Sequence, residues 1–231
     1  MIFEQLFDEK SSTYTYIIAS GEGREALIID PVIEHSNEYS TILKNLDLKL
    51  VKVIDTHIHA DHISALNELN KRTNCIRVMG EKSKSEVVDL RIKDGEKIKI
   101  ENVILQAIYT PGHTDCSYSF LMDDRVFTGD TLLINGSGRT DFQNGNAHDA
   151  YDSIFNKLLI LPEKTLVYPA HDYNGKKFST IESEKNNNPR LQVSSKEEYA
   201  DIMNNLNLAN PKMMDVAVPA NVKGLTLDNI N

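Results

Sequence analysis

The sequence predicts a mixed α/β (α+β) fold with two strand-rich halves, interspersed helices and a C-terminal appendage. Three observations predict it. β-Branched apolar segments recur along the chain, residues at helical spacing separate several of them, and polar turns bound most of them. The length of 231 residues suits one domain with an appendage. We expect a catalytic core over residues 1–175 and a helical or irregular appendage over residues 176–231 that belongs to the same domain.

In the first half, strands are predicted where β-branched and apolar residues cluster, at residues 13–19, 26–29, 50–54 and 76–79. A helix is predicted before the third of these strands, because apolar residues recur at helical spacing: Tyr39, Ile42, Leu43 and Leu46. A second helix is predicted after it, with an apolar stripe of Ile63, Leu66 and Leu69.

In the second half, two predicted strands, at residues 98–100 and 103–109, flank a polar turn. A hairpin is expected from residues 117–122 and 126–128, around Asp123 and Asp124. A helix from about residue 147 to about residue 159 precedes a strand at residues 165–168. Beyond these, Ser195 and Glu198 fit a capping box that opens a further helix.

Composition and charge exclude several classes of protein. The net charge of −9 disfavours a nucleic-acid partner, which would need a clustered basic surface. The N-terminal residues lack the basic and apolar regions of a secretory signal, and no apolar stretch approaches the length of a membrane span. Two cysteines cannot form a disulfide framework. We therefore expect a cytoplasmic protein with no membrane contact.

The most informative segment is residues 57–62, His-Ile-His-Ala-Asp-His, directly after the predicted strand 50–54. It places three imidazoles and one carboxylate within six residues. These ligands suit zinc, iron, manganese or copper, and the absence of thiolates argues against a closed structural zinc site.

Three later segments each add one ligand-type side chain after a β-rich stretch: His113, Asp130 and His171. Turns at these positions could direct the side chains to the same point as residues 57–62. A structural site needs only four ligands and no open position, so four loops converging on one metal indicate a catalytic centre.

The motif at residues 57–62, together with His113, Asp130 and His171, resembles the metallo-β-lactamase superfamily in order and spacing. Asp30 and Pro31 resemble an early strand–loop element of the same superfamily. The resemblance extends over residues 1–175. It implies an αββα sandwich, in which two β-sheets pack face to face with helices outside and metals at one edge.

A narrower resemblance is to the persulfide dioxygenases of the ETHE1 type. It rests on residues 129–134, 138–142, 168–173, 188–191 and 218–221. The alternative is a glyoxalase II-like thioester hydrolase with a dinuclear zinc or mixed-metal site. That family would carry Gly-Arg-Phe-Phe-Glu where this chain has Gly-Arg-Thr-Asp-Phe, and a longer helical C-terminal region. A metal-binding protein without catalysis is a third hypothesis, disfavoured by the intact set of ligand-type residues.

The resemblance to dioxygenases implies that His57, His113 and Asp130 bind one Fe(II) per chain. The implied reaction converts glutathione persulfide, dioxygen and water into glutathione and sulfite, in sulfide detoxification. The remaining ligand-type residues would then orient the iron ligands and hold water: His59, Asp61, His62 and His171. In hydrolytic relatives such residues complete a two-metal site, and because all seven are present the sequence alone leaves both arrangements open.

Three further residues are candidates for substrate contact. The Tyr173 hydroxyl is expected either to hydrogen-bond the substrate sulfur or bound oxygen, or to pack at the rim of the site. Arg139 is expected to pair with Asp141 or to reach a substrate carboxylate. Arg190 is the better candidate for bidentate contact with a glutathione carboxylate, against the alternative of a solvated surface arginine.

The expected partners are a small-molecule persulfide and dioxygen. A rhodanese would have to be a separate protein, because the chain has no room for one, and relatives of this type often form homodimers. Glutathione is the default carrier of the persulfide, although another thiol, such as coenzyme A, remains open.

Overall fold

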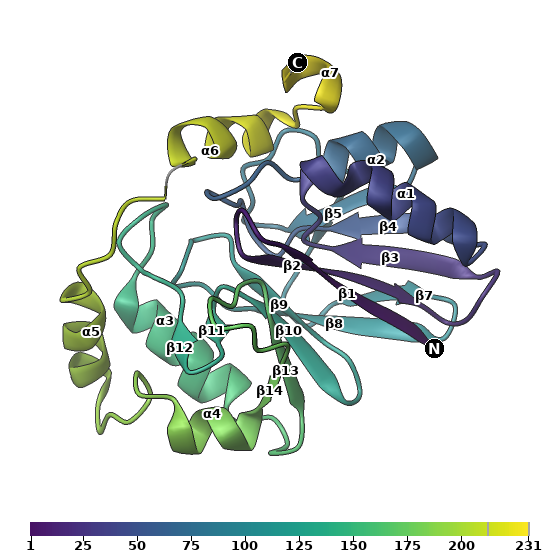
Figure 1. The fold of residues 1–231 in the computed structure, drawn as a ribbon. Helices are drawn as coiled ribbons and strands as arrows, with labels where there is room; N and C mark the ends of the chain where they lie inside the picture. Colours follow the sequence, from purple (N-terminus) through teal and green to yellow (C-terminus); the bar gives the residue numbers. More distant parts are fainter. Residues whose placement is uncertain (212, 231) are drawn as a thin grey trace.

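Two six-stranded β-sheets lie face to face in the computed structural model, which describes residues 1–211 and 213–230 (Figure 1). The first sheet follows chain order: β1 (Ile2–Asp8), β2 (Thr13–Ala19), β3 (Glu25–Ile29), β4 (Lys49–Ile54), β5 (Ile76–Gly80) and β6 (Leu90–Ile92). The second sheet has the order β14 (Ser179–Thr180), β13 (Leu166–Pro169), β10 (Arg125–Gly129), β9 (Tyr118–Leu121), β8 (Val103–Tyr109) and β7 (Lys97–Ile100). A small ribbon joins β11 (Leu132–Leu133) to β12 (Gly136–Ser137).

The interior between the sheets explains the apolar runs in the sequence. Successive strand residues point to opposite faces, so Tyr16 and Ile18 of β2 face the second sheet, where they share a buried cluster with Phe120 and Phe127. Ile17 and Ala19 point the other way into a different cluster. Because both faces of β2 are buried, it carries no charged residue, and its polar residues, Thr13 and Thr15, are buried with the apolar and aromatic ones.

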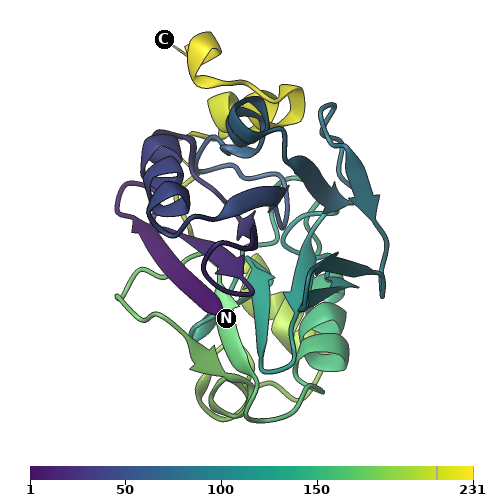
Figure 2. The same cartoon turned by 90° about the vertical axis from the view of Figure 1, so that its right-hand side faces the viewer.

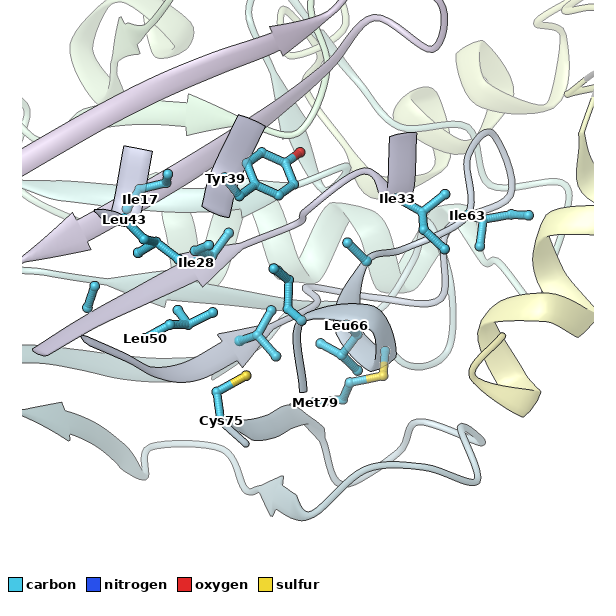
Figure 3. Close-up of a cluster of buried hydrophobic side chains, with 14 of the residues drawn as sticks. Ile17, Ile28, Ile33, Tyr39, Leu43, Leu50, Ile63, Leu66, Cys75 and Met79 are labelled. Carbon is cyan, nitrogen blue, oxygen red and sulfur yellow. The ribbon is translucent and has the colours of Figure 1, made fainter. Parts of the chain in front are cut away.

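Helices cover both outer faces, which confirms the predicted αββα sandwich. On the first sheet, α1 (Ser36–Asn45) and α2 (Leu66–Thr73) bury Tyr39, Leu43 and Leu66 against strand residues such as Ile28 (Figure 3). On the second sheet lie α3 (Ala147–Ser153) with a π-helical turn (Ile154–Leu158), α4 (Ile181–Asn187) and α5 (Lys196–Asn204). None of the helices in the described ranges is both long and apolar enough to cross a membrane.

Residues beyond 176 take part in both layers. Strand β14 pairs antiparallel with β13, and α4 and α5 pack on the second sheet. The chain then crosses to the first sheet, where α6 (Met214–Lys223) buries Ala217 and Ala220 in the cluster beneath α2, before α7 (Leu227–Ile230) (Figures 1 and 2). The division at residue 175 stays a prediction, but the residues after it add a strand and three packed helices to the sandwich.

Strand direction determines where the ligand-type residues meet. Strands β3 and β4 are parallel, as are β10 and β13, and β8 runs with β10 because both are antiparallel to β9. The loops that carry His57, His113, Asp130 and His171 therefore all leave carboxyl ends of strands. The carboxyl ends of parallel strands lie at one edge of a sheet, which brings these loops together.

Close approach of the two sheets at Gly80 yields a test of the packing. A Cβ atom added there would lie 2.1 Å from the ring of Tyr118, which is fully buried. We expect Gly80→Ala to destabilise the protein by about 1–3 kcal/mol, because the ring must shift within a close-packed interior. Thermal or denaturant unfolding measures this change. Gly21→Ala is the control, because its Cβ would meet only Arg24 Cγ at 3.7 Å; equal losses in the two variants would contradict the packing account.

Candidate metal centre

The loops after β4, β8 and β10 bring together His57, His113 and Asp130. One ligand atom from each lies within 4.8 Å of those of the other two. The rings of His57 and His113 meet edge to face, with centroids 4.9 Å apart. His113 Nε2 lies 3.5 Å from Asp130 Oδ2. The structure thus gathers the three residues that the resemblance assigns to iron.

Hydrogen bonds fix the tautomer of His57. Its Nδ1 lies 2.9 Å from Thr56 Oγ1, and the Thr56 hydroxyl donates to Asp30 Oδ2 at 2.9 Å. Because the single hydroxyl proton is used on Asp30, Thr56 accepts from His57 Nδ1–H. The proton is therefore on Nδ1, and His57 Nε2 carries a lone pair. That atom is buried and has no hydrogen-bond partner among the described residues.

His113 is oriented in the same way by a backbone group. Its Nδ1 lies 2.8 Å from the carbonyl oxygen of Arg139, which can only accept, so Nδ1 carries the proton and Nε2 carries a lone pair in the neutral ring. Asp130 Oδ1 is likewise buried without a partner in the described part of the chain. Buried polar atoms without partners are unfavourable, and here lone pairs from different loops converge. Two imidazole nitrogens and a carboxylate arranged in this way fit a divalent cation.

The electrostatics leave His57 and Asp130 in the protonation states that metal binding requires. Burial lowers the pKa of His57 well below its ordinary value, and the neighbouring His59 and His113 lower it further. Burial alone would raise the pKa of Asp130, but His171, His113 and His57 surround it and keep the pKa below its ordinary value. At neutral pH the cluster therefore offers a neutral His57 imidazole and an ionised carboxylate.

The other four ligand-type residues lie beside this triad. His59 donates from Nε2 to Asp30 Oδ1 at 3.1 Å, which leaves Nδ1 buried and unpartnered among the described residues. His62 Nδ1 lies 2.9 Å from Asp61 Oδ2, and His62 Nε2 is also buried without a partner there. His59, Asp61 and His62 thus form a second group with ligand atoms within 4.8 Å of one another.

His171 connects the two groups. Its Nδ1 faces the carbonyl oxygen of Ser12 at 3.1 Å, and its Nε2 lies 3.5 Å from Asp61 Oδ2 and 3.6 Å from Asp130 Oδ2. Burial alone would lower the pKa of His171, but the carboxylates of Asp130 and Asp61 raise it to about 9. The geometry of the protein alone is compatible with either one or two metals.

Several residues that support the site were not identified as functional from the sequence. Asp30 accepts hydrogen bonds from the Thr56 backbone N–H at 2.7 Å, from the Thr56 hydroxyl and from His59. The only signals were the Asp-Pro pair at a strand end and the position of Thr56 beside a ligand. The hydroxyl of Thr13 lies 3.1 Å from Asp61 Oδ2 and bridges the N-terminal hairpin to the site.

Gly138 lets the backbone pass close over two ligand-type residues. A Cβ atom there would lie 2.0 Å from the carbonyl oxygen of Asp130 and 2.9 Å from His113 Nδ1. The backbone N–H of Gly138 donates to that same carbonyl at 2.8 Å. The Gly-Ser-Gly stretch at residues 136–138 therefore shapes the metal centre.

A cavity of about 410 Å³ opens beside the triad. One wall is apolar, from Leu133, Leu208, Ala209 and Pro211. Tyr173 lies at the rim: it is 71% exposed, and its ring lies parallel to that of His171 with centroids 6.1 Å apart. This position agrees with the rim alternative for Tyr173, which is also one of the residues that line the cavity.

The two cavity arginines differ in what they contact. Arg139 makes a bidentate pair with the Asp141 carboxylate, with hydrogen bonds of 2.7 and 2.8 Å. It also donates to the carbonyl of Ala209, and its guanidinium lies over the Phe142 ring. Arg190 donates to the carbonyl of Ser137 and has no carboxylate partner among the described residues. Arg139 therefore shows the pairing with Asp141 that was one of its two expected roles, and Arg190 is the cavity cation available to an anion.

Comparison with known proteins agrees with this geometry. The family model described as the metallo-beta-lactamase superfamily matches residues 9–86 and 78–171. The chain belongs to this superfamily. The seven ligand-type residues lie in or directly at the end of the matched region, which supports a metal at this edge of the sandwich.

Three relatives show where the chain belongs within the superfamily. It is 43% identical to the mitochondrial persulfide dioxygenase ETHE1 of Mus musculus, over 96% of this chain and 88% of the relative. The crystal structure of ETHE1 from Myxococcus xanthus is 49% identical, with a TM-score of 0.94 over 96% of this chain and 98% of that one. Hydroxyacylglutathione hydrolase of Dictyostelium discoideum is 30% identical over 75% of this chain and 68% of its own length. Within the superfamily, the chain belongs to the ETHE1 persulfide dioxygenase family.

The Thr56 hydroxyl provides a test of how the metal ligands are oriented. We expect Thr56→Val to lower Fe(II) affinity about 10–100-fold, because His57 Nδ1 loses its acceptor and the ring its fixed orientation. Competition with a chelator measures the affinity. Thr15→Val is the matched control, because Thr15 is also a buried threonine but bonds the Asp30 carbonyl and the Tyr39 hydroxyl and contacts no ligand-type side chain. Equal affinities of the Thr56→Val and Thr15→Val proteins would contradict the orienting role.

Proposed function

We propose that this chain is an Fe(II)-dependent persulfide dioxygenase that holds one iron through His57, His113 and Asp130. Its substrate is a low-molecular-weight persulfide, with glutathione persulfide as the first candidate. The observation that supports the proposal most strongly is the convergence of two oriented imidazoles and one carboxylate beside a cavity, in a chain of the ETHE1 family. A persulfide, dioxygen and water then give a thiol, sulfite and two protons.

The donor set matches this chemistry. His57, His113 and Asp130 are a donor set that would hold a non-haem Fe(II), and the iron would supply the electrons for reaction with dioxygen. The two neutral imidazoles and one anion leave a net positive charge at the centre, which attracts a persulfide anion. His171 Nε2 lies between the carboxylates of Asp61 and Asp130, and because His171 lines the cavity it could donate a hydrogen bond to a substrate bound there.

The cavity residues bind and orient the rest of the substrate. Arg190 carries no carboxylate partner within the described ranges, so its guanidinium can bind a substrate carboxylate with two parallel N–H···O bonds. The apolar wall of Leu133, Leu208 and Pro211 packs on the substrate body and excludes water. Tyr173, at the rim, borders the same space.

A thioester hydrolase with a dinuclear zinc site is the second candidate. The observation in its favour is that His59 Nδ1 and His62 Nε2 are buried and, within the described residues, unpartnered near Asp61. These atoms could hold a second metal, as in hydrolytic members of the superfamily. Metal content separates the two candidates, because the dioxygenase needs one iron per chain and the hydrolase two metals.

The proposal also includes a cellular setting. We propose that the protein is cytoplasmic and forms a homodimer. We also propose that a separate rhodanese supplies the sulfur. The thiol that carries the persulfide is glutathione in this proposal, and coenzyme A is the alternative carrier.

Oxygen consumption tests the reaction directly. We expect anaerobically Fe(II)-loaded protein to take up oxygen and form sulfite when glutathione persulfide is added. His113→Ala should abolish both, because it removes one of three iron ligands. His148→Ala is the matched control and should retain activity, because His148 is exposed and outside the metal loops.

Full activity of His113→Ala would contradict its assignment as a ligand. The hydrolase would be favoured by three results together: the wild type takes up no oxygen, binds two metals per chain and hydrolyses S-lactoylglutathione.

Arg190 can be tested through the carboxylate that it is proposed to bind. We expect Arg190→Gln to raise KM about tenfold or more, because a charge-assisted hydrogen bond of about 1.5–3 kcal/mol is lost, and to change kcat much less. Steady-state kinetics with the free acid and with a carboxylate ester of the persulfide measure the effect. The variant and the wild type should have similar KM values for the ester. A persistent tenfold difference with the ester would contradict carboxylate recognition.

A further inference from the structure

The loop that carries most of the ligand-type residues has little secondary structure of its own. We call residues 55–65, between β4 and α2, the metal loop. Buried backbone carbonyls need partners, and in such a segment these must come from elsewhere in the chain. Thr56 O accepts from the Tyr118 N–H at 2.9 Å, and Ile58 O accepts from Gln143 Nε2 at 2.8 Å.

Two other carbonyls of the metal loop share a single donor. Asn221 Nδ2 donates to the carbonyl oxygen of His59 at 2.9 Å and to that of His62 at 3.0 Å. Asn221 Oδ1 in turn accepts from the Ser64 N–H at 2.8 Å. One side-chain amide therefore makes three hydrogen bonds to the metal loop, on both sides of Asp61, from about 160 residues away along the chain.

Asn221 can hold the metal loop firmly because its own helix is anchored. It lies in α6, in which Ala217 and Ala220 are completely or almost completely buried against the first sheet. The carbonyl of Val222 accepts from the Glu86 N–H at 2.8 Å, so the same helix is also fixed to a loop of the first half. In Figure 1, α6 lies along the upper edge of the sandwich with one end toward α2, and Asn67 of α2 donates to the Gly224 carbonyl at that end.

We propose that Asn221 is a positioning residue for the metal centre, which couples metal binding to the docking of helix α6. It holds the backbone of the metal loop at His59 and His62. Through the loop, it keeps the His57 ring directed toward His113 and Asp130. This inference rests on the proposed metal site. Because coupling free energies are reciprocal, a metal that orders the loop must also stabilise the docked position of α6.

The amide group distinguishes this role from simple packing. Asn221→Asp preserves the shape and the acceptor for the Ser64 N–H, but replaces the donor with an oxygen that faces two carbonyl oxygens. Asn221→Ala removes all three bonds. Asn70→Ala is the matched control, because Asn70 Nδ2 donates to the Cys75 carbonyl at 2.7 Å, a bond that involves neither α6 nor the metal loop.

The first measurement is the affinity for Fe(II), by anaerobic competition with a chelator, together with the melting temperature of each metal-free variant. We expect Asn221→Asp and Asn221→Ala to lose about 10–100-fold in affinity, and Asn70→Ala to lose stability without losing affinity. If Asn221→Asp bound Fe(II) as tightly as the wild type, the inference about Asn221 would be overturned, and the proposed iron site would stand. Failure of the wild type to bind Fe(II) would overturn the proposed iron site and this inference with it.

A second measurement uses only the wild type, so that it stands even if the Asn221 variants do not fold. Amide hydrogen exchange is compared between metal-free and Fe(II)-loaded protein. We expect iron to slow exchange at Ser64 and across residues 214–223, but not across α5 at residues 196–204. Protection confined to residues 57–62, with α6 unaffected, would overturn the coupling.

Discussion

The buried carboxylate of Asp30 is the interaction on which the metal centre depends. It accepts three hydrogen bonds, two from Thr56 and one from His59, and so fixes the metal loop at two residues. The parallel pairing of β3 and β4 brings Asp30 beside Thr56, because both residues lie just beyond the paired strand ends. Asp30 adopts a positive φ of 49°, which turns the chain away from β3 at this point. The sandwich thus determines where the carboxylate lies, and the carboxylate determines how the histidines are oriented.

The surrounding chain supplies the remaining orientation from atoms that are far apart in sequence. The carbonyl of Arg139 holds His113, the carbonyl of Ser12 holds His171, and Asn221 holds the loop backbone. Such supporting hydrogen bonds fix ring tautomers and directions, and a metal site depends on them as much as on its ligands. N-terminal, central and C-terminal segments therefore all contribute to one centre.

Much of the fold and the site could be predicted from sequence, for identifiable reasons. The buried strands were clear because β2 and its neighbours place buried apolar residues on both faces. The ligand-type residues were clear because imidazoles and carboxylates rarely cluster within six residues. Strand β1 was missed because it is an edge strand with half-exposed polar residues such as Gln5. Strands of two or three residues, such as β14, are too short to show a period.

Other features depend on tertiary contacts that leave little trace in the sequence. Ile63 was expected within α2, but the helix begins at Leu66, because tertiary bonds from Ile33 and Asn221 hold residues 63 and 64 outside it. Helix α6 contains Pro219, which usually indicates a break. The backbone carbonyls that orient His113 and His171 carry no residue signature. The choice between one and two metals depends on chemistry that seven ligand-type residues alone do not determine.

The most direct test of the account is to locate the metal in crystals of the iron-loaded protein by anomalous diffraction at the iron edge. The account predicts one peak per chain, within bonding distance of His57 Nε2, His113 Nε2 and the Asp130 carboxylate. A second peak of comparable height among Asp61, His62 and His171 would contradict a mononuclear iron centre. It would favour the dinuclear hydrolase.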